Sequence, residues 1–203
     1  MKRFAALLVP CALACGSTAG ALAQVPADTV RGALLYTAAD VDFMTGMIAH
    51  HAQAVAMSRW APSHGASPSV RTLCERIINA QTDEIALMRR WLGDHHQPVP
   101  APDPRGMSMP GMDQPMLMPG MLTPAQMAQL DSARGPEFDR LFLRLMIQHH
   151  SGAVTMVNAL FARGAGEEET VYKFASDVYA DQTTEIARMQ RMLGTVLFGA
   201  PSQ

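Results

Sequence analysis

The sequence predicts an all-α protein, a four-helix bundle built from two repeated helical hairpins and a crossover linker rich in Met, Pro and Gly. Three observations predict it. Aromatic residues make up only 6% of the 203-residue chain. Apolar residues in long stretches recur at the helical rather than the alternating period. An ordered set of identities also occurs twice, about a hundred residues apart, which indicates internal duplication.

The first residues have the features of a secretory signal peptide. Lys2 and Arg3 precede an apolar run, and Ala21-Leu22-Ala23 fits a cleavage site. We therefore expect a signal peptide over 1–23, a tail over 24–36, and an exported, periplasmic mature protein. Secretion, and a lipid anchor on Cys15, are the alternatives. No other run is long and apolar enough to span a bilayer, so no membrane span is expected in the mature chain.

The first hairpin is expected over 37–94. Thr37 and Asp40 have the spacing of a capping box, and Ser67-Pro68 offers an N-cap followed by proline in the first turn of a second helix. The joint between the two helices is short, which is typical of antiparallel neighbours.

A linker over 95–123 and a second hairpin over 124–198 complete the domain, so that 37–198 form one unit. A short helix is expected first, with Thr123 as its cap, Pro124 in its first turn and Gln126 completing a capping box. Pro136 marks the next helix start, and the acidic run 167–169 suits the N-terminus of the last helix.

The duplication pairs two kinds of segment. DFMTGMIAHHAQAVAM (42–57) aligns with LFLRLMIQHHSGAVTM (141–156), and QTDEIALMRRWL (81–92) aligns with QTTEIARMQRML (182–193). Ser151-Gly152 stands where the first copy has Ala52-Gln53, and a glycine inside a helix costs about 1 kcal/mol relative to alanine. Each hairpin thus joins an HH segment to an EI-M segment.

Net charge and cysteine content argue against a nucleic-acid-binding protein and against a disulfide-stabilised fold. Loss of Lys2 and Arg3 from the 16 basic residues leaves 14 against 18 acidic, a net charge of −4 that shows no nucleic-acid footprint. Signal cleavage also removes two of the three cysteines, so the mature chain has no disulfide framework. The remaining Cys74 is read as a small core residue.

Soft donors gather on one face of each HH helix and on its partner. His50 and His51 differ by about 100° around the helix, so we expect one near the bundle axis and the other nearer the helix edge. Burying adjacent histidines and a glutamate is costly unless all are partnered. We predict metal binding by two donor sets, one from each hairpin, which form either two sites or one central site that both hairpins share. The first set is Met47, His50, His51, Met57, Glu84 and Met88, and the second is Met146, His149, His150, Met156, Glu185 and Met189.

Donor softness selects the metal. Thioethers with imidazoles suit Cu(I), and Cu(II) or Ag(I) are also possible, whereas Mg, Ca and Mn prefer oxygen. The two glutamates either ligate the metal or accept the second N–H of a histidine, and we favour the accepting role. Plain core packing of the methionines is the alternative.

The linker repeats a methionine pattern, MSMPGM followed by MLMPGM. In a solvent-exposed Pro/Gly loop we expect an auxiliary metal trap, with docking of the methionines on the bundle as the alternative. The six residues are Met107, Met109, Met112, Met116, Met118 and Met121. His95 and His96, at the start of the linker, either join this trap or form a polar helix end.

The repeated M-I-x-H-H-x-x-A-V-x-M segment, followed each time by Q-x-x-E-I-x-x-M-x-x-x-L, resembles the domain-of-unknown-function family three-hundred-and-five over residues 40–194. The resemblance implies a ferritin-like bundle, an extracytoplasmic location and, for some members, copper binding and tolerance. It also implies that the two donor sets above carry the metal. The second set has Met192 in place of Trp91, so we expect that site to be less enclosed.

We therefore expect a binding protein rather than an enzyme. It would sequester or buffer Cu(I), and also Ag(I), outside the cytoplasm, with metal ions and other exported copper-handling proteins as partners. One alternative is a ferritin-like dinuclear metal oxidase, although the chain has no Glu-x-x-His motif and few repeated carboxylates. The other is a metal-free exported helical module that acts through partners.

Overall fold

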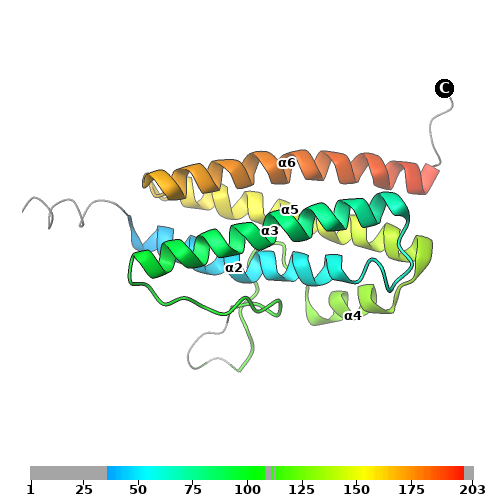
Figure 1. The fold of residues 1–203 in the computed structure, drawn as a ribbon, viewed down its shortest axis with the longest axis horizontal. Helices are drawn as coiled ribbons and strands as arrows, with labels where there is room; N and C mark the ends of the chain where they lie inside the picture. The colour runs from blue at the N-terminus through cyan, green and yellow to red at the C-terminus, as the bar shows by residue number, and fades with distance from the viewer. Residues whose placement is uncertain (1–35, 108–110, 112, 199–203) are drawn as a thin grey trace, which may run out of the picture. The chain divides into compact units, whose positions relative to one another are not determined.

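Five helices make up the regular structure of the described residues, which a computed structural model gives as 36–107, 111 and 113–198. The predicted all-α class is confirmed (Figure 1). The helices are α2 (Ala38–Arg59), α3 (Pro68–Asp94), α4 (Pro124–Ser132), α5 (Gly135–Ala162) and α6 (Glu169–Phe198). The predicted signal peptide, nearly all of the tail, Met109 and Met112 lie outside the described residues.

The helices begin where local side-chain signals place them. Thr37 and Asp40 form the predicted capping box at the start of α2, and Thr123 with Gln126 forms the one at the start of α4. Ser67 caps α3 through its hydroxyl, which accepts from Val70 N. These side chains satisfy backbone N–H groups that have no partner within the helix.

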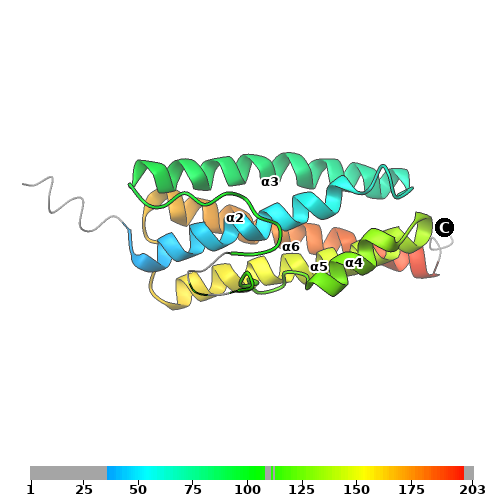
Figure 2. The ribbon, with the colours of Figure 1, turned by 90° about the horizontal axis from the view of Figure 1, so that it is seen from below.

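The helices pack as two pairs, α2 along α3 and α5 along α6, and α2 also contacts α5. Colours in Figures 1 and 2 show that α2 and α5 run in opposite directions. The short α4 lies against α5. The N-terminal half of α2 therefore lies beside the C-terminal half of α5, which decides how the two donor sets meet.

Two buried aspartates join the helix pairs at their ends. Asp40, at the start of α2, accepts from Gly166 N at 2.7 Å, in the turn between α5 and α6. Asp139, near the start of α5, accepts from Ser67 N at 3.1 Å and 3.2 Å, in the turn between α2 and α3. Asp40 is 1% exposed and Asp139 is 5% exposed. Each aspartate therefore satisfies a backbone N–H of the other helix pair.

The linker contains no helix between His95 and Thr123 in its described part. It contacts α2 at Gln53 and α5 at Gly152. Met107 and Met116 form an antiparallel bridge, with Met107 N donating to Met116 O at 2.9 Å and Met116 N to Met107 O at 2.8 Å. Further along, the linker closes over α2, so that this helix is buried on nearly every side. None of the helices in the described ranges has the length and apolar content needed to cross a membrane.

Candidate metal site

Four histidines form a completely buried cluster where α2 meets α5. His50, His51, His149 and His150 are each 0% exposed. The rings of His50 and His149 lie 3.8 Å apart between centroids, and each is 6.2 Å from the ring that follows it in sequence. The two members of each pair have different neighbours: His50 and His149 face each other across the contact, whereas His51 and His150 lie beside Glu84 of α3 and Glu185 of α6. All four are nevertheless fully buried.

A glutamate from the partner helix contacts the second histidine of each pair. His150 Nε2 lies 2.8 Å from Glu185 Oε2 in a hydrogen bond, and His51 Nε2 lies 2.8 Å from Glu84 Oε2 without the alignment of a hydrogen bond. The two carboxylate side chains are 18% and 19% exposed, so each spans the distance between the core and solvent. This is the arrangement in which a carboxylate orients an imidazole through its outer nitrogen.

The linker supplies the acceptor for His50. Its Nε2 lies 3.0 Å from the carbonyl oxygen of Pro119. Because a carbonyl oxygen only accepts hydrogen bonds, His50 Nε2 must carry the hydrogen. His149 has no hydrogen-bond partner on either ring nitrogen within the described part of the chain. The two facing histidines therefore differ in their surroundings.

The Nδ1 atoms of all four histidines, here called the inner nitrogens, have no hydrogen-bond partner among the described residues. Within the described ranges, Nδ1 of His50, His51, His149 and His150 is buried and makes no hydrogen bond. Burial, and to a lesser degree the nearby His51, lowers the pKa of His50 to about 3. Burial followed by the proximity of His50 lowers the pKa of His149 well below its ordinary value. Both rings are neutral at pH 7, which is the form that ligates metals.

Six buried methionines flank the histidines, but they are shared between the helix pairs. Met47 and Met88 of the first predicted set lie in one hydrophobic cluster with Met156 of the second. Met57 of the first set lies in the other cluster with Met146 and Met189. The methionines of each predicted set are therefore divided between the two clusters: Met57 is separated from Met47 and Met88, and Met156 from Met146 and Met189. This grouping fits the opposite directions of α2 and α5.

The sequence predicted that the linker methionines are exposed, but their exposure differs from one to the next. Met116 is 37% exposed and Met107 is half-buried, whereas Met121 is only 5% exposed. Met118 is half-buried and packs against the cluster that contains Met47 and Met156. The exposed-trap expectation is thus wrong for Met118 and Met121, because this end of the linker docks on α2 and α5.

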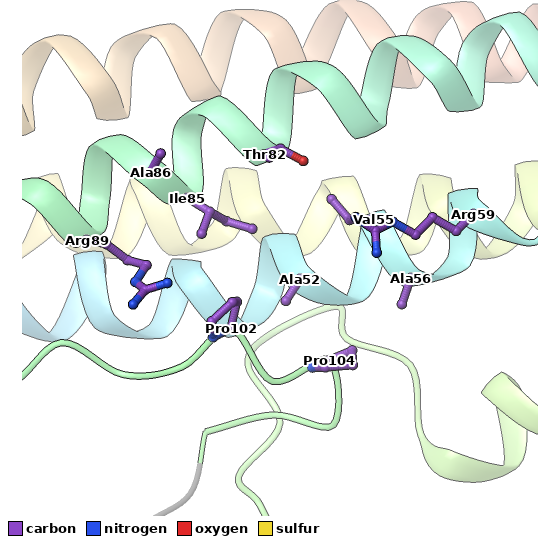
Figure 3. Close-up of a pocket in the computed structure, with 10 residues that line it drawn as sticks. All are labelled: Ala52, Val55, Ala56, Arg59, Thr82, Ile85, Ala86, Arg89, Pro102 and Pro104. Atoms are coloured by element: carbon purple, nitrogen blue, oxygen red, sulfur yellow. The ribbon is translucent and has the colours of Figure 1, made fainter.

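A surface pocket between α2, α3 and the linker contains none of the predicted donors. It has a volume of about 400 Å³, and small apolar side chains, Pro102 and Pro104 form much of its wall. Figure 3 shows the side chains of Arg59 and Arg89 at opposite ends of it. A smaller pocket of about 170 Å³ is lined by both Pro119 and Met156. Met156 is the member of the two donor sets that lines this second pocket.

Cys74, His95 and His96 lie apart from the four histidines. Cys74 is 2% exposed within the core, as predicted, and burial raises the pKa of its thiol to about 12. His95 ends α3, where its ring lies 4.3 Å from that of Trp91 and its Nδ1 donates to Trp91 O at 2.8 Å. His96 is exposed. In the described part of the chain, no three or more His, Cys, Asp or Glu side chains are placed as a metal-holding group.

Several residues near the site were not singled out as site residues from the sequence. Gln81 and Gln182 occupy corresponding positions one turn before Glu84 and Glu185, and they are 2% and 3% exposed. Gln81 Oε1 and Nε2 and Gln182 Oε1 have no partner among the described residues. Their repetition in both EI-M segments was the available signal, since a buried amide in an apolar stripe is costly.

Known proteins resemble this chain in sequence and in fold. The profile of DUF305, described as a domain of unknown function, matches residues 40–193. The crystal structure of a putative secreted DUF305 protein from Streptomyces coelicolor matches with 29% identity and a TM-score of 0.67, covering 81% of this chain and 98% of that one. A DUF305 fragment from Deinococcus radiodurans matches with 31% identity and a TM-score of 0.65, covering 78% and 97%.

Among the similar structures is CopM in its Cu(I)-bound form, with 28% identity, a TM-score of 0.60 and coverage of 79% of this chain and 98% of that one. CopM structures with Cu(II) and with silver also match. A comparison with curated proteins found no match. The match over 40–193 spans the helices and both HH segments, so the chain belongs to the DUF305 family.

Proposed function

We propose that this protein binds a soft metal ion outside the cytoplasm and sequesters or buffers it without catalysing a reaction. Cu(I) is the favoured ion, and Ag(I) and Cu(II) are further candidates. The donors are the predicted imidazoles and thioethers at the α2–α5 contact, held within a ferritin-like bundle of two repeated hairpins. The outer Glu84 and Glu185 orient the histidines in this proposal.

The observation that carries the proposal is the set of four unpartnered Nδ1 atoms. Leaving a buried polar atom without a partner costs about 1–3 kcal/mol. Four such atoms at one contact are a substantial cost unless a ligand satisfies them. Nε2 of His50 and Nε2 of His150 are hydrogen-bonded, so Nδ1 is the nitrogen that each offers to a cation. In the same proposal Glu84, 2.8 Å from His51 Nε2, leaves Nδ1 of His51 to the cation.

The surrounding side chains select the class of cation. Five of the six methionines on the helices that carry the histidines and their glutamates are 0% exposed, and Met156 is 9% exposed, so these thioethers are shielded from water. Polarisable thioethers and neutral imidazoles favour monovalent copper and silver over cations that prefer oxygen. The similarity to CopM, whose structures include copper- and silver-bound forms, supports the same class of ion.

Export is proposed on two grounds. The N-terminal sequence has the organisation of a signal peptide, and a similar structure belongs to a protein described as putatively secreted. Partners among other exported copper-handling proteins are part of the same proposal, since a buffering protein must exchange its metal.

An anaerobic competition titration with Cu(I) and a chromogenic chelator tests the proposal. We expect the wild-type protein to compete for Cu(I), and H50Q/H149Q to lose the tightest equivalent. The matched control is H64Q, because His64 is buried at 4% exposure but is hydrogen-bonded by Ser63 and Asp131 outside the cluster. Retention of full competition by H50Q/H149Q, with folding verified by circular dichroism, refutes the assignment.

A further inference from the structure

The end of the linker is seated between two glycines. We call Met118–Gly120 the strap. A Cβ added at Gly152 of α5 would overlap Pro119 O and would lie 2.5 Å from Gly120 Cα. A Cβ added at Gly46 of α2 would lie 2.9 Å from Met118 Sδ. A helix-interior glycine is otherwise unfavourable, so Gly152 is explained by the room that it gives the strap.

The strap is also tied down from its C-terminal side. Gln53 is 1% exposed, and its Oε1 accepts from Leu122 N at 2.6 Å. Its Nε2 donates to Leu122 O at 3.1 Å and to Pro104 O at 3.0 Å. One glutamine side chain therefore holds two stretches of the linker against α2.

Gln53 and Gly152 occupy corresponding positions in the two aligned HH segments. Both face the linker, one by binding it and the other by leaving space for it. Because there is only one linker, it makes different contacts with these two positions. This difference explains why the repeat has glutamine in one copy and glycine in the other. It also accompanies the different surroundings of His50, which contacts Pro119 O, and His149, which has no such partner in the described ranges.

We propose that the strap is a positioning element of the metal site, which fixes His50 with hydrogen on Nε2 and a free lone pair on Nδ1. The Pro119 carbonyl is the acceptor that holds this tautomer. His149 has no such acceptor in the described ranges and is the adaptable member of the pair. The inference rests on the proposed function, since it names the nitrogen that His50 offers to the cation.

The direct test is NMR of the His50 ring nitrogens in the metal-free protein at neutral pH. Wild type is expected to show a protonated Nε2 and an unprotonated Nδ1. In G152A, where the new methyl group displaces Pro119 O, the tautomer ratio is expected to fall about fivefold, the ratio that one net hydrogen bond sustains. Hydrogen exchange at Met121 and Leu122 reports whether the strap has moved.

Two further variants control the test. G194A adds a methyl group inside α6 where nothing lies within 4 Å, and it should leave the tautomer unchanged. Q53L frees the linker from α2 without altering Gly152, and it should shift the His50 tautomer in the same direction as G152A. A wild-type Nδ1–H tautomer, or a G152A or Q53L strap that moves without changing the ratio, overturns the proposal.

Measuring Cu(I) binding by the same variants distinguishes this inference from the proposed function. If His50 is positioned by the strap, G152A should weaken Cu(I) binding by about 10–100-fold, as loss of an orienting partner does, while G194A binds as wild type. Wild-type affinity in G152A, with the strap displaced, contradicts the positioning role. Absence of Cu(I) binding in every protein refutes the proposed function, whereas the tautomer measurement still decides the role of the strap.

Discussion

The rings of His50 and His149 lie 3.8 Å apart between centroids, with their planes inclined by 39°, although they come from different helices and neither is exposed. Two neutral imidazoles tolerate this proximity. Two imidazolium ions would repel each other in a region from which water is excluded. Protonation of both histidines would therefore weaken the packing of α2 on α5.

The metal-free protein is expected to lose stability as pH falls below about 6.5. An unfolded His50 or His149 binds a proton near its ordinary pKa of 6.5, whereas burial lowers the pKa of folded His50 to about 3 and that of His149 well below 6.5. The unfolded state then binds more protons, so each histidine removes up to about 1.4 kcal/mol per pH unit between pH 6.5 and its folded pKa.

Urea denaturation at several pH values between 7.5 and 4.5 measures this effect, with wild type compared with H50Q/H149Q. His51, His150, Glu84 and Glu185 stand beside the pair and are unchanged in both proteins. The double variant should show a shallower decline in the free energy of unfolding. Equal slopes in the two proteins would show that the pair does not take up protons on unfolding.

Removal of Asp40 is expected to destabilise the protein by about 1–3 kcal/mol, because D40A leaves the buried Gly166 N–H without its acceptor. D139A should have a similar effect through Ser67 N. The control is D42A, whose carboxylate is 69% exposed and 3.9 Å from Arg163, and which should change the free energy by less than about 0.5 kcal/mol. Thermal denaturation that ranks D42A with D40A would contradict the role of the buried aspartates.

Loss of Glu84 or Glu185 is expected to weaken metal binding about 10–100-fold, as removal of a residue that orients a ligand does. E84Q and E185Q retain an oxygen acceptor for His51 and His150 and should lie between wild type and the alanine variants. Isothermal titration with Ag(I) measures the change, and E75A, on the exposed face of α3, is the control. Equal affinities in E84A, E185A and E75A would remove both glutamates from the site.

Leucine at Met57 or Met156 should separate sulfur chemistry from packing. The swap conserves volume and should cost less than about 1.5 kcal/mol of stability. Affinity for Ag(I) should nevertheless fall, because a thioether donor is lost. M127L makes the same change at a half-buried methionine of α4 that is outside the predicted set. If M57L and M156L bind Ag(I) as M127L does, these methionines serve only as core residues.

The helices and their starts were predictable because their signals are local. The capping box of Thr37 with Asp40 and that of Thr123 with Gln126 depend only on side chains three residues apart and the backbone between them. The contacts of His51 with Glu84 and of His150 with Glu185 were also within reach, since repetition pairs each HH segment with the segment that follows it.

The grouping of Met57 with methionines of the second set, and of Met156 with methionines of the first, was not predictable in the same way. Repetition identifies two similar hairpins, but the hydrophobic pattern does not state which end of α2 meets which end of α5. The docking of Met118 and Met121 depended on the same contact, because the strap rests on both helices at Gly46 and Gly152. The available signal was the glycine at position 152 of the second HH segment, where the first has Gln53.

X-ray absorption at the copper K-edge of the anaerobic Cu(I) protein tests the central claim most directly. Binding at the α2–α5 contact predicts imidazole nitrogen together with thioether sulfur around copper, and a weaker imidazole signal in H50Q/H149Q. A shell of sulfur alone would place copper on methionines away from the histidines, and an imidazole signal that persists unchanged in H50Q/H149Q would likewise contradict the claim.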